Sequence, residues 1–221
     1  MIVSGPARRA RRAWLLHCSV LALAAAAPGF AAAPRPARIL VVGDSLSAEY
    51  GLPRGSGWVA LLERRLADEK LKATVLNASI SGDTTAGGRS RLPALLTTHK
   101  PTHVVIELGA NDALRGLALD VTRRNLAEMA AASKAAGASV LLVGMRMPPN
   151  YGRRYGDDFI AVYADVAREQ GARLVPFLLK NVADAPNADS LFQADRIHPL
   201  AKAHPTMLDN VWPVLKPLLA S

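Results

Sequence analysis

Four short segments of this 221-residue chain carry side chains that together could perform acyl transfer. Ser45 stands in the sequence Gly-Asp-Ser-Leu, Gly82 in Ser-Gly-Asp and Asn111 in Gly-Ala-Asn-Asp. His198 follows Asp195 by three residues. A serine hydroxyl is a weak nucleophile until a base takes its proton, and a histidine oriented by a carboxylate can be that base. A backbone N–H and an amide side chain can stabilise the oxyanion that forms.

Each segment also has an ordinary structural interpretation when it is taken alone. Serine is common in turns, and a turn glycine such as Gly82 supplies a positive φ. Asn111 and Asp112 together can start a turn and cap a helix, and Asp112 fits that structural role well. The catalytic hypothesis therefore depends on whether the fold brings the four segments together.

The segments follow predicted strands of one parallel sheet. Short runs rich in Val, Ile and Leu alternate with amphipathic stretches, which predicts a β-α-β-α order with helices on both faces of the sheet. The predicted strands are Arg38–Val42, Ala73–Leu76, His103–Leu108, Ala138–Val143 and Arg173–Pro176. The predicted helices are Gly57–Lys70, Gly87–Thr98, Val121–Ala136, Asp157–Gln170 and about Pro199–Leu219.

This pattern predicts a three-layer α/β/α sandwich around a flavodoxin-like, five-stranded parallel sheet. The strands are expected to be buried on both faces. Ligand sites of such sheets lie beyond the carboxyl ends of the strands, where the four segments are expected. Gly137 and Gly171 fall where helices should end before the next strand.

The remaining histidines of the predicted domain have structural interpretations. His99 and His103 flank the start of the third strand, at the opposite end of the sheet from the ligand site. His204 falls inside the last predicted helix, and Pro199 suits the first position of that helix. Only His198 combines a nearby carboxylate with a loop that precedes a helix.

The N-terminal segment predicts a protein that is exported, periplasmic or secreted. Arginines at positions 8 to 12 precede an apolar run over 14–27 and small residues at 29–33. This is the layout of a signal peptide over 1–33, with a retained anchor as the alternative, and the domain spans 37–221. Without that segment the chain has 23 basic and 18 acidic residues, a net charge of +5, and no cysteine. Disulfides and thiolate chemistry are thereby excluded.

The charge pattern bears on partners. The basic residues of the domain are scattered among acidic ones, and no dense basic stripe with aromatic neighbours predicts nucleic-acid binding. A solvated surface is the simplest interpretation. Attraction to an anionic lipid surface is a second interpretation.

In these motifs the sequence resembles the SGNH/GDSL hydrolase family, and within it a subgroup of bacterial periplasmic acyl-CoA thioesterases, lysophospholipases and related arylesterases. The similarity extends from Ile39 to about Leu218. The matching blocks are Gly43-Asp44-Ser45-Leu46, Gly82, Gly109-x-Asn111-Asp112 and Asp195-x-x-His198. Longer segments also match, among them Asn77–Thr84, Arg91–Leu96, Glu107–Gly109 and Asn150–Tyr155.

The resemblance implies a serine esterase without metal or cofactor that acts as a monomer on acyl esters or thioesters. Ser45 would be the nucleophile, His198 the base and Asp195 its orienter. The oxyanion would be held by the N–H groups of Ser45 and Gly82 and by the amide of Asn111. The resemblance also implies substrate-binding residues on the acyl side, namely Asp112, Leu114, Met147, Pro148 and Tyr151.

Three alternatives remain at the level of sequence. A carbohydrate acetylesterase uses the same scaffold. A metal-dependent phosphoesterase could recruit Asp44, Asp83, Asp112 and His198, although one loop offers few histidine ligands. A binding module without activity would be indicated by loss of Ser45, Asn111 or His198, and all three are present.

Overall fold

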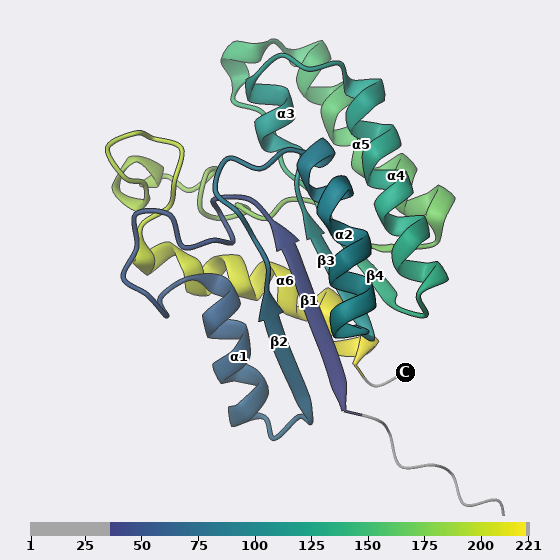
Figure 1. Ribbon diagram of the computed structural model, residues 1–221. Helices are drawn as coiled ribbons and strands as arrows, with labels where there is room; N and C mark the ends of the chain where they lie inside the picture. Colours follow the sequence, from purple (N-terminus) through teal and green to yellow (C-terminus); the bar gives the residue numbers. More distant parts are fainter. Residues whose placement is uncertain (1–35, 220–221) are drawn as a thin grey trace, which may run out of the picture. The chain divides into compact units, whose positions relative to one another are not determined.

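Five parallel strands form a single sheet in the order β2-β1-β3-β4-β5 (Figure 1). The computed structural model describes residues 36–219, and Arg35–Ser221 form one compact unit. The strands are β1 (Ala37–Gly43), β2 (Ala73–Asn77), β3 (His103–Glu107), β4 (Ser139–Val143) and β5 (Arg173–Val175). The predicted signal segment 1–33 lies outside the described residues. The order is that of a flavodoxin-like sheet, so the predicted fold class is confirmed.

The helices lie in two layers that enclose the sheet. Helices α1 and α6 pack together on one side, and α4 packs between α2 and α5 on the other (Figure 1). Their bounds are α1 (Trp58–Asp68), α2 (Thr85–His99), α3 (Ala110–Leu114), α4 (Leu119–Ala135), α5 (Arg153–Gln170) and α6 (His204–Leu218). Short 3₁₀ turns occur at η1 (Pro149–Tyr151), η2 (Ala188–Leu191) and η3 (Ala201–Ala203).

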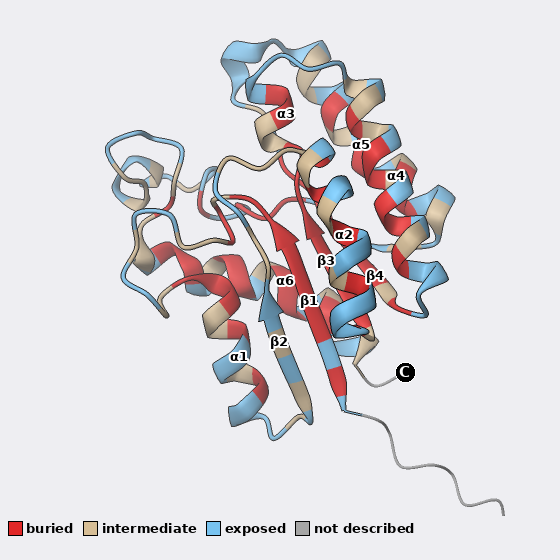
Figure 2. Cartoon of the chain, viewed as in Figure 1, coloured by how far each residue is buried: buried red, intermediate tan, exposed pale blue. Residues whose placement is uncertain are grey.

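Burial differs between the strands. β1, β3 and β4 are almost wholly buried, as Figure 2 shows for the centre of the sheet. β2 is half exposed. β5 is also partly exposed, so the expectation that all strands are buried on both faces is wrong for β2 and β5, because these are the two edge strands. The fully buried side chains of β1 and β3, with large groups such as Trp58 and Phe159 from the helices, form the core.

Three helix predictions need correction. Pro199 does not begin a helix, since it pairs with Phe192 in an isolated bridge and α6 begins at His204. α5 begins one turn before the predicted Asp157, at Arg153. The five-residue helix α3 was not predicted, because it is too short to show a hydrophobic period. The predicted stop at Gly171 is confirmed, with φ +58.

No helix within residues 36–219 has the length and apolar character needed to cross a membrane.

Candidate active site

The four sequence segments meet at the carboxyl edge of the sheet. Ser45 lies two residues after β1, and Gly82 lies in the loop between β2 and α2. Asn111 belongs to α3, which directly follows β3, and His198 lies in the long loop after β5. Parallel strands place all of their carboxyl ends at one edge, so residues separated by up to 153 positions become neighbours.

Ser45, His198 and Asp195 form a continuous hydrogen-bonded chain. Ser45 Oγ lies 2.9 Å from His198 Nε2, and His198 Nδ1 lies 2.7 Å from Asp195 Oδ2. Both distances lie within the range that proton transfer from a serine to a histidine base requires. The arrangement can therefore remove the serine proton while the carboxylate holds the opposite ring nitrogen.

Asp195 is held in its ionised form by its own loop. Its Oδ1 accepts hydrogen bonds from the backbone N–H groups of Ile197 (2.9 Å) and His198 (3.0 Å). Partial burial raises the pKa of Asp195, but these hydrogen bonds and the one from the imidazole outweigh it and lower the pKa to about 2. Asp195 is therefore a carboxylate at any pH at which the protein would act.

The loop of the base has two further features. The ring of Tyr50, in the loop after β1, lies 4.4 Å from the His198 ring, centroid to centroid, at a tilt of 40°. Arg196, between the acid and the base, has a φ of +58, which a residue with a side chain seldom adopts. The loop turns back at this residue, and the turn places the Asp195 carboxylate within hydrogen-bond distance of His198 Nδ1.

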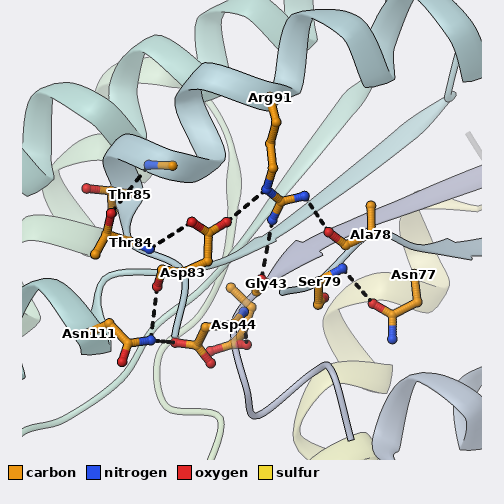
Figure 3. Close-up of polar contacts among 12 residues, drawn as sticks. Gly43, Asp44, Asn77, Ala78, Ser79, Asp83, Thr84, Thr85, Arg91 and Asn111 are labelled. Carbon is orange, nitrogen blue, oxygen red and sulfur yellow. Dashed lines mark hydrogen bonds and ion pairs between the residues drawn. The ribbon is translucent and has the colours of Figure 1, made fainter. Parts of the chain in front are cut away.

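The residues predicted to hold the oxyanion lie among the loops after β1, β2 and β3, part of which Figure 3 shows. Asn111 Nδ2 donates to the backbone carbonyl of Asp83 at 2.9 Å and to Asp44 Oδ2 at 3.1 Å. Gly82 has a φ of +77 at the turn that the N–H of Asp83 closes onto the carbonyl of Ile80. The turn requires a positive φ at this position, and glycine adopts it without strain.

Arg91 of α2 ties these loops together, as the sticks in Figure 3 show. Its Nε lies 2.8 Å from Asp83 Oδ2, and the guanidinium also donates to the backbone carbonyls of Ala78 and Gly43. The side chains of Arg91 and Asp83 are only 21% and 11% exposed. One guanidinium thus connects α2 to the ends of β1 and β2.

Two buried carboxyl groups lie beneath the turn that carries Ser45. Burial raises the pKa of Asp44 to about 6, against hydrogen bonding from the N–H of Leu46. Burial, together with the nearby charge of Asp44, also raises the pKa of Glu107 well above its ordinary value. Glu107 Oε2 accepts a hydrogen bond from Ser47 Oγ at 2.7 Å, and Ser47 Oγ in turn accepts one from Trp58 Nε1 at 3.1 Å.

Asp112 is part of the structure behind the site. It is buried, and its carboxylate accepts hydrogen bonds from the N–H and the hydroxyl of Thr85, to which Asn125 also donates. This agrees with the structural interpretation of Asp112 rather than with contact to substrate. Gly109, just before α3, has a φ of +121, and an added Cβ would lie 2.5 Å from the Tyr163 hydroxyl.

A cavity of about 570 Å³ opens beside Ser45 and His198. The predicted residues Leu114, Met147 and Pro148 line it, whereas Asp112 and Tyr151 are not among its lining residues. The large apolar side chains of its remaining wall are those of Leu46, Met145, Phe177, Leu179, Phe192 and Ile197. Tyr151 is exposed in η1 and stacks with Tyr155 at 6.4 Å. The cavity suits an apolar acyl group.

The proposed ligands of a metal-dependent alternative have other partners. Asp83 binds Arg91, and Asp112 binds Thr85. Within the described residues no three His, Cys, Asp or Glu side chains lie close enough to hold a metal ion. His103 lies at the amino end of β3, and the Nδ1 of buried His204 accepts a hydrogen bond from the Trp58 N–H.

Sequence reasoning did not single out Tyr50, Arg91 or Glu107. A signal existed for Glu107, because a carboxyl residue at the end of an otherwise apolar strand needs a partner. Arg91 begins one of the segments that resemble the family, but no local pattern assigns it a contact with the site. The contact of Tyr50 with His198 joins residues 148 positions apart, and no local pattern indicates it.

Comparison with known proteins identifies relatives over the same region. The model of the GDSL-like lipase/acylhydrolase family matches residues 41–205. The chain is 56% identical to esterase TesA of Pseudomonas aeruginosa over 82% of this chain and 89% of that protein. It is 42% identical to thioesterase 1/protease 1/lysophospholipase L1 of Escherichia coli K12, over 82% and 84% of the two chains. A crystal structure of TesA matches with a TM-score of 0.79 and 55% identity, covering 82% of this chain and 99% of that one.

Proposed function

The chain belongs to the GDSL-like lipase/acylhydrolase family, and from this premise we propose that it is a serine esterase with Ser45 as its nucleophile. The observation that carries the proposal is the hydrogen-bonded chain from Ser45 Oγ through His198 to Asp195. The reaction class is supported by two relatives, of which one is named an esterase and the other a thioesterase, protease and lysophospholipase.

In the proposed mechanism the Ser45 oxygen attacks the acyl carbonyl while His198 Nε2 takes its proton. Asp195 stabilises the imidazolium that forms. When the tetrahedral intermediate collapses, His198 returns the proton to the leaving alcohol or thiol, and the acyl group remains on Ser45. Water, activated by the same histidine, then attacks the acyl-enzyme and releases the carboxylic acid.

The oxyanion is proposed to bind between the N–H groups of Ser45 and Gly82 and the amide of Asn111. Among the described residues, no acceptor is found for the first two N–H groups. Both amide hydrogens of Asn111 have acceptors, and we propose that the longer hydrogen bond, to Asp44, is shared with the oxyanion. Each such donor contributes about 3 kcal/mol to the transition state.

The substrate class is proposed to be small carboxylic esters or thioesters with an apolar acyl group, such as aryl esters, acyl thioesters and lysophospholipids. Met145, Phe177 and Leu179 give the cavity an apolar lining that fits such a group. We further propose that the enzyme is exported, on the basis of the N-terminal segment described above, and that it acts as a monomer without metal or cofactor.

The test is hydrolysis of p-nitrophenyl esters of increasing acyl length in the presence of EDTA. Ser45→Ala is expected to reduce kcat by about 10⁴-fold or more, because the nucleophile is lost while the fold is kept. Ser81→Ala, at an exposed serine of the neighbouring loop, is the matched control and should retain activity. Activity that survives in Ser45→Ala but is abolished by EDTA would overturn the proposal. Preference for acetyl esters alone would favour the carbohydrate acetylesterase.

A further inference from the structure

The exposed large apolar side chains gather at one end of the molecule. Six of the seven in the described part of the chain follow the carboxyl end of a strand, and each of the five strands is followed by at least one. They are Tyr50 after β1, Ile80 after β2, Leu114 and Leu117 after β3, Tyr151 after β4 and Ile197 after β5. We call the surface that carries them the loop face.

The apolar side chains of the loop face are well exposed. Ile80 is 53% exposed, Tyr50 50% and Ile197 49%. Scattered single apolar residues are common on protein surfaces, but a set confined to one end is a candidate contact surface. Figure 2 shows these loops as largely exposed beyond the tips of the strands.

The same loops carry exposed arginines. They are Arg54 after β1, Arg115 after β3, Arg146, Arg153 and Arg154 after β4, and Arg196 after β5. Among the described residues, Arg115, Arg146 and Arg196 form no ion pair. Arg115 donates to the carbonyl of Gly82, and Arg146 lies over the ring of Phe177. Neither positive charge is therefore paired with a carboxylate.

Acidic groups also lie on this face: some have a cationic partner, and Asp184 and Asp189 form no ion pair among the described residues. The carboxylate of Asp83 pairs with Arg91, and the carboxylate of Asp195 accepts a hydrogen bond from the His198 ring. Asp184 and Asp189 lie at the cavity, where Asp184 accepts a hydrogen bond from the N–H of Asn181. Arg153 and Arg154 are 95% and 96% exposed, and their carboxylate partners, 3.8 and 4.0 Å away, lie one turn further into α5. Such exposed pairs are weak.

The cavity beside Ser45 opens on the loop face. Leu114 and Ile197 belong both to the exposed apolar set and to the cavity lining, and Arg146 and Arg196 line the cavity as well. A molecule that leaves a surface in contact with this face would therefore meet the cavity without passing through bulk water.

We propose that the loop face docks on the surface of an anionic phospholipid membrane, with its apolar side chains among the acyl chains near the headgroups and its arginines on the phosphates. Amphipathic tyrosines and apolar tips next to basic residues suit the boundary between headgroups and acyl chains. An anionic surface attracts each nearby arginine. The docking itself does not depend on the proposed esterase activity. Only its consequence, that acyl esters enter the cavity from the lipid phase, rests on the proposed function.

The test measures co-sedimentation of the Arg35–Ser221 unit with vesicles of phosphatidylglycerol and phosphatidylcholine, and of phosphatidylcholine alone. Arg35–Ser221 form one compact unit, and a crystallised TesA chain that matches 82% of this chain over 99% of its own length shows that a relative of about this size folds by itself. Arg153→Gln/Arg154→Gln removes two charges from the loop face. Lys70→Gln/Lys72→Gln removes two exposed charges before β2, at the opposite edge of the sheet, and is the matched control.

Wild type is expected to bind the anionic vesicles more tightly than the neutral ones, and added salt should weaken that binding. The arginine variant should bind the anionic vesicles about 10- to 30-fold more weakly, and the lysine variant should match wild type. Leu117→Ser changes an exposed apolar residue outside the cavity lining and should weaken binding to both vesicles by about threefold to tenfold.

Two results would overturn the inference: no binding of wild type to anionic vesicles, or equal losses in the arginine and lysine variants. The latter would mean that net charge alone attracts the protein. Hydrolysis of a soluble p-nitrophenyl ester is measured on the same samples and should be the same in all of them. A wild type that does not hydrolyse the ester would contradict the proposed esterase function. A wild type that hydrolyses the ester but does not bind vesicles would contradict only the proposed membrane docking of the loop face.

Discussion

The nucleophile side and the base side of the candidate site are held in different ways. Beneath Ser45 lies a buried polar network that joins the ends of β1, β2 and β3 through Asp44, Glu107 and Arg91. His198 instead lies in an exposed loop, and its carboxylate partner is three residues away in that loop. The proposed oxyanion donors are thus held by long-range contacts, and the proposed base is held mainly by local ones.

This difference separates activity from stability. The buried network is expected to contribute to both, because a buried polar group without its partner destabilises the folded protein. The loop of the base is expected to contribute mostly to activity, because its hydrogen bonds are local and partly exposed. Four predictions test this division, from the largest expected effect to the smallest.

Asp195→Asn should lower kcat/KM by about 10³- to 10⁴-fold while changing the free energy of unfolding by less than about 1 kcal/mol. The amide oxygen can still accept from the N–H groups of Ile197 and His198, so the loop keeps its shape. The amide nitrogen of the new asparagine would donate to His198 Nδ1, so the imidazole proton would lie on Nε2. Nε2 could then no longer accept the proton of Ser45. Ester hydrolysis and urea unfolding measure the two quantities. A large loss of stability would show that the loop is structural.

Arg91→Met should affect both quantities. The free energy of unfolding is expected to fall by about 2–4 kcal/mol, because Asp83 would keep a largely buried charge without its partner. We expect kcat to fall by about 10- to 100-fold with little change in KM, because the turn at Gly82 and the acceptor of Asn111 would shift.

The matched control for Arg91 is Arg89→Met on the same helix. Arg89 pairs with Glu128 at 2.8 Å, but both side chains are about half exposed, so a loss below about 1 kcal/mol is expected. Equal effects of the two substitutions would show that Arg91 has no special relation to the site.

Asp44 should give the stability of the protein a distinctive pH dependence. Its folded pKa of about 6 exceeds the ordinary value of 3.8, so the folded state binds the proton more tightly than the unfolded state. The stability due to this group is fully present below pH 3.8 and is lost as the pH rises through 6, a change on the order of 2–3 kcal/mol.

Comparison of wild type with Asp44→Asn isolates this contribution. The difference in free energy of unfolding, wild type minus variant, should decrease by that amount between pH 4 and pH 8 in urea titrations. A difference that is independent of pH would mean that the Asp44 carboxyl is not shifted by its burial.

Arg196→Gly should give the smallest effect. Glycine adopts the φ of +58 without strain, so the free energy of unfolding should rise by up to about 1 kcal/mol. Lys70→Gly, at a φ of +55 after α1, is the matched control and should give a similar gain. A gain at Lys70 without one at Arg196 would indicate that contacts of the Arg196 side chain stabilise the loop of the base.

Much of the molecule could be predicted from the sequence. The alternation of apolar runs and amphipathic stretches predicted the parallel sheet, and most strand ends lie within one residue of the expected positions. The four motifs predicted which residues meet at the carboxyl edge. Local periodicity sufficed there because each strand and helix carries its own pattern, and the topology rules for parallel sheets do the rest.

Only the tertiary structure decided which supporting residues surround those motifs. The carboxyl group of Glu107 and the guanidinium of Arg91 act across strands, and the ring of Tyr50 reaches His198 from another loop. Such contacts depend on the register of strands and the path of loops, which no local period encodes. The sequence by itself determined the sheet and the candidate residues at its carboxyl edge, because each of these has a local pattern. The packing of distant segments decided which other residues hold those candidates in place.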